Sequence, residues 1–382
     1  MKQSRTHTRA HRIRPYLIAA ATAALLGATG TTPADADTGT TADFHLSVNA
    51  QGLSVPFHTV RDSTGNWSPW DQPANNFTTA TSVPTSATQA EGGGKMYYLA
   101  ERPGNGAPGL DNQPADEYEF GIWDIATAHW TVPLSPTYWI ARIDKDTGNL
   151  FTQKLVGSAV IGGQLRIFAL DDFGNINMNT YVGNGQGVQG NDWLGWGVDA
   201  PVLMSGLRGI TDAAVATTNG TDLQVAAIAN GKVYHSLCAG LATGCTAVGD
   251  VYGATRSNPG VANHIAVAGV NGTLQVVVTT DNGASLYHAV RSANGSWTTF
   301  GNVEAATKSA PGTITSIAMA PSGGSSTSDV MELAALNSTG TIYHTIRSTS
   351  GSWTAMQSVQ PNVPGSNPFA GHQPSFLVAS GE

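Results

Sequence analysis

Three side chains, His, Arg and Trp, recur with fixed spacing in this sequence. In each of three segments, Arg follows His by three residues and Trp follows it by nine. The sets are His58, Arg61 and Trp67; His288, Arg291 and Trp297; and His344, Arg347 and Trp353. A Trp ring can stack on the apolar C–H face of a pyranose, and His and Arg can donate hydrogen bonds to sugar hydroxyls. All nine residues are therefore candidate ligand-binding residues for a carbohydrate.

The same residues also have a packing interpretation. Repeat signatures usually encode contacts between neighbouring repeats, and Arg can stack on Trp within such a contact. Strand alternation places Tyr287 and Arg291 on one face and His288 on the other. One blade's Arg and the next blade's His are then expected to meet in one inter-blade cleft. The sequence leaves both interpretations open.

The set lies inside a longer pattern that also contains an aromatic residue before His and a Gly two residues before Trp. Weaker copies surround Trp130 and Trp193, and Cys245 stands near the Trp position of a further copy. These anchors are 52 to 63 residues apart. A period of this length is typical of propellers or solenoids. We predict an all-β fold, a single β-propeller with six blades; a weak unit around Tyr138 to Val156 would make seven.

Short strands, rather than helices, must position these side chains. The chain has 45 glycines and only 12% charged residues, which suits many strands joined by tight turns. No long segment combines helical periodicity with caps, so almost no helix is expected. Segments such as 265–270 are apolar on both faces, as in blades that neighbours cover on both sides.

The two ends of the chain complement each other. Phe44 to Val48 matches the second strand of a unit, and Pro374 to Ala379 matches a lone first strand. Together they would complete one blade, so we predict that residues 375–380 pair with 44–48. Such pairing of the N- and C-terminal strands closes a ring and leaves no open sheet edge.

The two cysteines occupy positions of the repeat. Cys238 stands where Arg would be, and Cys245 stands one residue after the Trp position. In an exported protein, a pair at this spacing indicates a disulfide.

The first 36 residues have the features of an export signal. Lys2 and four arginines precede the apolar run Leu17 to Gly30, and Ala34-Asp35-Ala36 offers a cleavage site. The run is too short to cross a bilayer comfortably. We expect a signal peptide at 1–36, a propeller domain at 37–382, secretion from the cell and no membrane insertion.

The net charge of the chain limits which classes of binding partner are expected. Cleavage after Ala36 would remove five of 18 basic residues and one of 26 acidic residues, which leaves a net charge of −12. This acidity argues against nucleic acid as a partner.

The repeat resembles that of secreted bacterial β-propeller lectins of the fucose-binding type. Tyr287-His288 to Arg291, with Gly295-Ser296-Trp297, corresponds to their Tyr-His-x-Ile-Arg…Gly-Ser-Trp signature. The resemblance is good in three units, partial in the fourth and weak from about residue 79 to 200. It implies a propeller that binds glycans, of fucose type or others, at sites between blades.

An enzyme is the rival class. Sialidases are propellers, but the turns here lack the Asp of their Asp-box repeat. A glycosidase needs two suitably spaced carboxylates. Candidates in the irregular stretch are Glu101, Asp116, Glu117, Glu119 and Asp124. Asp144 to Asn149 faintly resembles a calcium loop, but Leu155 stands where the bidentate Glu belongs, so no metal or cofactor is expected.

The sequence therefore favours a secreted carbohydrate-binding propeller without catalysis. The alternatives are an extracellular glycan-cleaving enzyme and a protein-interaction scaffold. The units ending at Trp67, Trp297 and Trp353 are neighbours in a closed ring, so binding is expected to cluster in the clefts between them.

Overall fold

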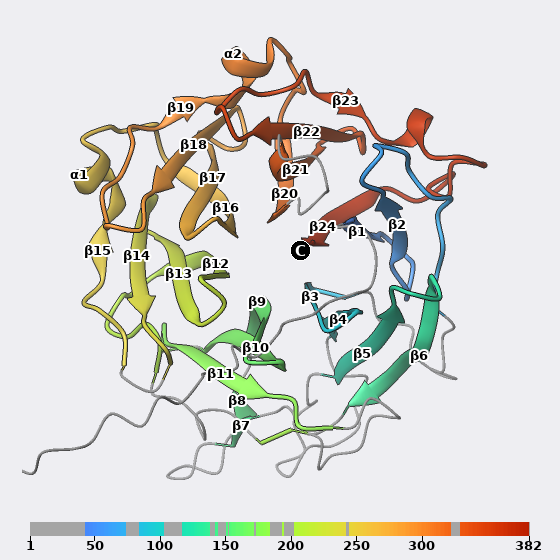
Figure 1. The fold of residues 1–382 in the computed structure, drawn as a ribbon, viewed down its shortest axis with the longest axis horizontal. Coiled ribbons are helices and arrows are strands. Elements are labelled where there is room, and N and C mark those ends of the chain that lie inside the picture. Colours follow the sequence, from blue (N-terminus) through green and yellow to red (C-terminus); the bar gives the residue numbers. More distant parts are fainter. Residues whose placement is uncertain are drawn as a thin grey trace, which may run out of the picture. The chain divides into compact units, whose positions relative to one another are not determined.

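Six β-sheets form the blades of a ring in the computed structural model (Figure 1). The structure describes residues 43–73, 84–102, 117–137, 142–143, 150–151, 153–171, 173–183, 193–194, 202–241, 244–321 and 329–381. The expected signal peptide at 1–36 lies outside these ranges. Within them, no helix is long and apolar enough to span a membrane.

Each blade is an antiparallel sheet whose first strand lies nearest the ring axis. Blade 1 consists of β24 (Pro374–Ser380), β1 (Phe44–Ala50) and β2 (Phe57–Arg61). Blade 2 consists of β3 (Ser86–Gly92), β4 (Lys95–Arg102), β5 (Glu117–Asp124) and β6 (His129–Thr137). Blade 3 consists of β9 (Gln153–Ile161), β10 (Gln164–Asp171) and β11 (Ile176–Thr180).

The other three blades are regular four-stranded sheets. Blade 4 consists of β12 (Ile210–Thr218), β13 (Asp222–Ala229), β14 (Lys232–Cys238) and β15 (Gly249–Asp250). Blade 5 consists of β16 (Ala262–Val270), β17 (Thr273–Thr280), β18 (Ser285–Arg291) and β19 (Gly301–Asn302). Blade 6 consists of β20 (Ile314–Pro321), β21 (Asp329–Asn337), β22 (Ile342–Ser348) and β23 (Gln357–Ser358).

Helical turns are few among the described residues and lie at the outer edge of the ring. They are α1 (Val251–Thr255) after β15, α2 (Val303–Thr307) after β19, and the 3₁₀ turn η2 (Gln360–Asn362) after β23. A separate hairpin of β7 (Arg142–Ile143) and β8 (Leu150–Phe151) precedes β9. The segment that might have formed a seventh blade thus contributes this hairpin and the start of blade 3. The six-blade prediction is confirmed.

The second strand of each regular blade is buried on both faces. In β13 and β17, every residue after the first is buried. A strand can bury both faces only when a blade covers it on each side, which is why these segments read as continuous apolar runs rather than alternating ones.

Blade 1 closes the ring from both ends of the chain. β24 pairs with β1 in antiparallel register from His45 opposite Ser380 to Ala50 opposite Pro374. β1 in turn pairs with β2, from Phe44 opposite Arg61 to Val48 opposite Phe57. β24 therefore ends in the middle of the ring (Figure 1). The predicted pairing of the termini is confirmed.

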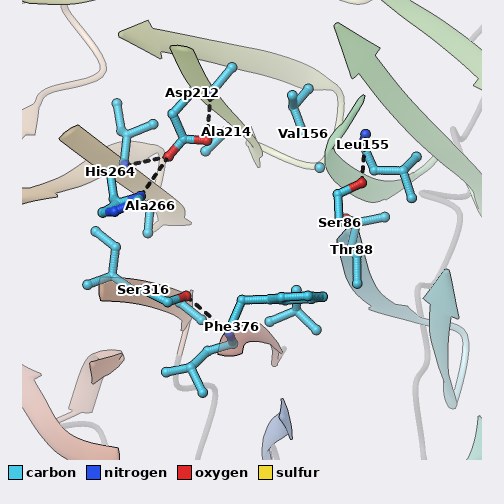
Figure 2. A pocket seen from close by; sticks show the side chains of 18 of the residues that line it. Ser86, Thr88, Leu155, Val156, Asp212, Ala214, His264, Ala266, Ser316 and Phe376 are labelled. Atoms are coloured by element: carbon cyan, nitrogen blue, oxygen red, sulfur yellow. Dashed lines mark hydrogen bonds and ion pairs between the residues drawn. The ribbon is translucent and has the colours of Figure 1, made fainter. Parts of the chain in front are cut away.

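The first strands leave unpaired backbone groups facing the axis, and side chains of neighbouring blades satisfy several of them. Leu155 N–H donates to Ser86 Oγ at 3.2 Å, Ile265 N–H to Asp212 Oδ2 at 3.1 Å, and Leu377 N–H to Ser316 Oγ at 3.1 Å (Figure 2). Each bond joins two adjacent blades. These contacts cap strand edges that would otherwise be open to pairing with another chain.

Deleting residues 374–382 should abolish cooperative unfolding. The deletion removes the innermost strand of blade 1 and exposes the edges of β1 and of the neighbouring first strands. Urea unfolding followed by Trp fluorescence measures this. The matched control removes Glu382 alone and should unfold like the full chain. A β24 deletion with an unchanged midpoint and slope would contradict closure by the termini.

Candidate functional site

The His, Arg and Trp sets meet at the junctions between blades. The His ring of one blade contacts the Trp ring of the following blade edge to face. Ring centroids are 5.4 Å apart for His235 and Trp297 at junction 4/5, and 5.3 Å for His288 and Trp353 at junction 5/6. They are also 5.3 Å apart for His344 and Trp67 at junction 6/1. One set is thus divided between two blades.

Each of these His side chains is oriented by an acceptor on the second strand of its own blade. His235 Nε2 donates to Gln224 Oε1 at 2.7 Å, and His288 Nε2 donates to Gln275 Oε1 at 2.9 Å. His344 Nε2 donates to Glu332 Oε2 at 2.6 Å. The amides of Gln224 and Gln275 donate in turn to Thr218 and Thr273. The three junctions thus share one geometry but differ in one acceptor.

Two of these His side chains are held in the neutral form. Burial, with a smaller contribution from the charge of Arg291, lowers the pKa of His235 to about 3. Burial, with a smaller contribution from Arg347, lowers the pKa of His288 to about 3. Because Arg291 pairs with Trp297 and Arg347 with Trp353, each Arg lies on the face that is turned to the His of the preceding blade. The sequence had correctly placed Arg and His on opposite faces of one strand, but it paired Arg with the next blade's His; the direction was wrong because strand alternation does not tell which face is turned to which neighbour.

Arg and Trp of one set lie opposite each other across a hairpin. Arg61 pairs with Trp67, Arg291 with Trp297 and Arg347 with Trp353 in antiparallel bridges. Cross-strand partners share one face of the sheet, so the guanidinium and the indole are presented together to the preceding blade.

The Gly of the repeat makes room for the guanidinium. Gly351 has φ +84°, and a Cβ there would lie 3.1 Å from Arg347 Nη2. Gly65 and Gly295 have the same left-handed conformation, with Nη2 of Arg61 and Arg291 at 2.9 and 3.2 Å from the added Cβ. The turn therefore needs Gly both for its backbone and for the Arg above it.

Among the described residues, the guanidinium groups of Arg291 and Arg347 have no counter-ion and make no hydrogen bond, and the Nε of Arg347 is buried without a partner. Burial lowers the pKa of both residues. Each guanidinium shares a sheet face with its cross-strand partner, Trp297 or Trp353.

Arg61 has a different environment. Its Nη1 donates to Glu332 Oε1 at 2.8 Å, so one carboxylate joins Arg61 of blade 1 to His344 of blade 6. A cavity of about 460 Å³ opens at this junction, and Arg61, Trp67 and His344 are among the residues that line it. This is large enough to admit a monosaccharide.

His58 lies at junction 1/2 and has no Arg beside it. In blade 2 the residue opposite Trp130, where Arg stands in the other sets, is Trp123, and the His58 ring packs against Trp123 at 4.6 Å and Trp130 at 5.7 Å. Its Nε2 lies 3.0 Å from His45 Nδ1. His58 is fully buried there, whereas Arg61 and Trp67 lie at junction 6/1. The structure thus separates His58 from the other two members of its set.

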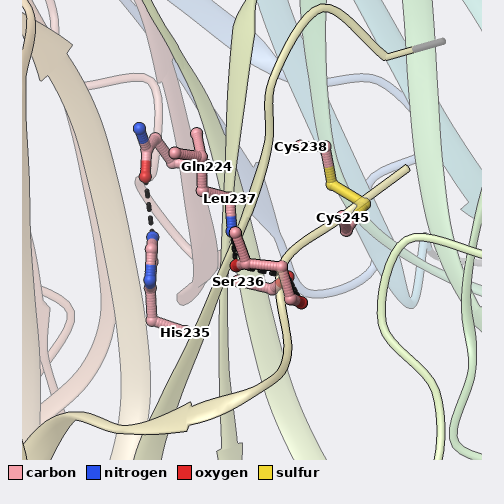
Figure 3. The surroundings of a disulfide bond; sticks show 7 residues. Gln224, His235, Ser236, Leu237, Cys238 and Cys245 are labelled. Carbon is pink, nitrogen blue, oxygen red and sulfur yellow. Dashed lines mark hydrogen bonds between the residues drawn. A yellow bond between two sulfur atoms is a disulfide. The ribbon is translucent and has the colours of Figure 1, made fainter. Parts of the chain in front are cut away.

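The disulfide between Cys238 and Cys245 is present, as predicted. The two residues form a bridge at the position that Arg and Trp occupy elsewhere. Figure 3 shows the disulfide and His235 on opposite sides of blade 4. Blade 4 therefore has the disulfide in place of Arg and Trp on the side of blade 3. Its His235 still contacts Trp297 of blade 5, so junction 4/5 contains a His, an Arg and a Trp.

A second cavity, of about 410 Å³, lies along the ring axis and is lined by the first strands of all six blades (Figure 2). Asp212 is the one carboxylate among the described residues that line it. It lies 3.5 Å from Lys154 Nζ and 3.8 Å from His264 Nδ1. The two-carboxylate arrangement of a glycosidase is not found among these lining residues.

The other carboxylates suspected from the sequence have structural surroundings. Glu101 is buried and accepts hydrogen bonds from Ser86 Oγ and the Leu155 amide. Glu119 is buried in an ion pair with Arg102. Asp124 caps an exposed turn through Thr127. Asp116 and the Glu117 side chain lie outside the described residues.

Comparisons with known proteins bear on the fold. No protein-family model matches the chain, and no curated protein matches its sequence. The solved structure of AofleA from Arthrobotrys oligospora superposes with a TM-score of 0.50 at 11% identity, over 90% of this chain and 94% of that one. This likeness supports the propeller fold.

Two further solved structures match less well. The six-bladed β-propeller lectin of Aleuria aurantia, described with a mode of fucose recognition, has a TM-score of 0.48 at 14% identity, over 86% of this chain and 98% of that one. The sialidase of Trypanosoma rangeli has a TM-score of 0.44 at 14% identity, over 83% of this chain and 55% of that one.

The sequence alone did not identify the side chains that accept the hydrogen bonds of the three His residues. Gln224, Gln275 and Glu332 occupy one position of the second strand, in the segments Leu-Gln-Val, Leu-Gln-Val and Met-Glu-Leu. The repeated Leu-Gln-Val was a visible signal. Its meaning needed the strand register, which places each acceptor opposite the residue two after His: Leu237, Val290 and Ile346.

Replacing both cysteines by Ser should lower the free energy of unfolding by about 2–3 kcal/mol, because the disulfide closes a short loop that is otherwise free in the unfolded chain. Denaturant unfolding of oxidised wild type, reduced wild type and the double variant checks this. Reduced wild type should match the double variant. Equal stability of the oxidised and reduced proteins would contradict the prediction.

His288→Gln should reduce the loss of stability at acid pH. The folded-state pKa of about 3 lies below the ordinary value of 6.5, so the stability that neutral His288 provides is present above pH 6.5 and lost as pH falls toward 3. The stability difference between wild type and variant should therefore shrink from pH 7 to pH 4. Substitution of the partly exposed His372 by Gln is the control. A difference independent of pH would show that His288 is not buried in the neutral form.

Proposed function

We propose that this protein is a secreted, non-catalytic carbohydrate-binding propeller whose sites are junctions 4/5, 5/6 and 6/1. The observation that carries the proposal is the pairing of a Trp ring with guanidinium donors that no protein group satisfies, as at Trp353 and Arg347. A pyranose supplies what is missing, because its apolar face stacks on the indole and its hydroxyls accept from the guanidinium.

Packing alone does not account for these arginines. Arg291 and Arg347 are partly buried, and partial burial of a charge without a protein partner costs free energy that an apolar side chain of similar size would not. The His side chains, by contrast, are buried and satisfied inside their own blades. The proposal therefore assigns Arg and Trp to ligand contact, and assigns His235, His288 and His344 to orienting the Trp.

Export from the cell is part of the proposal. The disulfide is suited to an oxidising compartment, and the basic and apolar N-terminal segment has the composition of a signal peptide. The neutral sugar L-fucose is one candidate ligand because the repeat resembles that of fucose-binding propeller lectins. Three sites on one arc would raise avidity on a dense glycan surface.

The double substitution of Arg291 and Arg347 by Met should reduce the number of bound sugars from three to one without loss of stability. Arg61 is kept because its removal would leave Glu332 without its counter-ion. Isothermal titration calorimetry measures stoichiometry, with L-fucose, D-mannose and D-galactose as probes. Thermal melting of the same samples follows the fold.

The control variant is Lys232→Met, which removes an exposed cation from blade 4 and should bind like wild type. A double variant that melts normally and keeps three sites would overturn the assignment of these arginines. Release of free sugar from a bound oligosaccharide would overturn the non-catalytic assignment and favour the enzyme.

A further inference from the structure

The three junctions differ in electric charge although their geometry is the same. At junctions 4/5 and 5/6, the acceptor that orients His is a neutral glutamine, Gln224 or Gln275. At junction 6/1 it is Glu332. The first two junctions therefore hold an Arg whose charge no nearby group neutralises, whereas Glu332 neutralises Arg61 at 2.8 Å.

Further acidic groups increase this contrast. Burial, together with the charges of Asp62 and Glu332, raises the pKa of Asp43 to about 6. Asp43 therefore adds an acidic side chain of blade 1 in the neighbourhood of Glu332, the residue that pairs with Arg61. The residues at the position of Asp62 in the other two sets are the uncharged Ser292 and Ser348. For Arg291 and Arg347, burial is the only resolved cause of the lowered pKa.

We propose that the residue at the position of Gln224, Gln275 and Glu332 sorts ligands by charge. Junctions 4/5 and 5/6 bind sugars that carry an anionic substituent, a carboxylate or a sulfate ester, through Arg291 and Arg347. Junction 6/1 binds uncharged sugars. This inference rests on the proposed function and specifies which class of sugar each junction takes.

The physical reason is the cost of an uncompensated guanidinium. A ligand anion at junction 5/6 would form charge-assisted hydrogen bonds with Arg347 and supply the missing counter-charge. At junction 6/1 the same anion would face Glu332, which already holds Arg61. The amide groups of Gln224 and Gln275 cannot compete for Arg, because each is engaged with His through its oxygen and with Thr through its nitrogen.

The test compares D-glucuronate with D-glucose, two probes that differ only in a carboxylate. Wild type should bind two glucuronate molecules about tenfold more tightly than glucose, as expected for charged hydrogen bonds. The comparison of galactose 6-sulfate with galactose tests whether a sulfate ester is bound in the same way as a carboxylate. Titrations with sodium acetate and sodium sulfate alone show whether an anion without a sugar ring binds at these junctions.

Reciprocal substitutions locate the effect. Gln224→Glu with Gln275→Glu should remove the tenfold preference while glucose still binds, because each new Glu would neutralise its Arg as Glu332 does. Glu332→Gln should add a third glucuronate site. Gln164→Glu, an exposed change of the same charge on blade 3, is the matched control and should leave the preference unchanged.

The outcomes separate the two proposals. If glucose and glucuronate bind equally and the Gln→Glu pair changes nothing, the sorting by charge is wrong while carbohydrate binding stands. If no probe sugar binds to folded wild type, both are wrong. If the Gln→Glu pair fails to fold, Glu332→Gln decides alone: an unchanged glucuronate stoichiometry overturns the inference.

Discussion

The contact between a buried His and the Trp of the following blade is the interaction on which the regular half of this ring depends. It joins blade 4 to 5, blade 5 to 6 and blade 6 to 1 with centroid distances of 5.3 to 5.4 Å. His235 and His288 are held in the neutral form because each is buried and faces the Arg of the next blade. A hydrogen bond to Gln or Glu fixes its orientation and so fixes the Trp.

The same contact creates the candidate site. Because Trp and Arg are cross-strand partners on one hairpin, any interaction that positions the Trp also positions the guanidinium. Packing and binding are therefore compatible explanations of the repeat. In the proposed function, His contributes to packing, Arg to binding, and Trp to both.

Elsewhere in the ring other contacts replace this one. At junction 2/3, Phe120 packs against Trp193 at 5.7 Å, and Tyr181 stands opposite Trp193 where Arg would stand. At junction 3/4 the disulfide takes the place of Arg and Trp. Aromatic area and a covalent bond can thus hold blades together, but in the described part of these junctions no Arg stands at the repeat position opposite a Trp. The arc from blade 4 to blade 1 is chemically distinct.

The sequence was sufficient to predict the blade number, the closure by β24 and β1, and the disulfide, since each follows from the spacing of repeat residues. It was not sufficient to assign the partners across a junction. His58 and Arg61 are three residues apart, yet one faces blade 2 and the other faces blade 6. The role of Glu332 depends on Arg61, which is 271 residues away along the chain, and only the closed ring brings them together.

The most direct test of this account is to locate a bound sugar by X-ray diffraction. Crystals grown with a sugar that carries a selenomethyl aglycone would give anomalous peaks at the binding sites. The account predicts peaks at the junctions beside Trp297, Trp353 or Trp67, with sugar hydroxyls or acidic groups within hydrogen-bond distance of the neighbouring Arg. Peaks confined to the axial cavity beside Asp212, with the junctions empty, would contradict it.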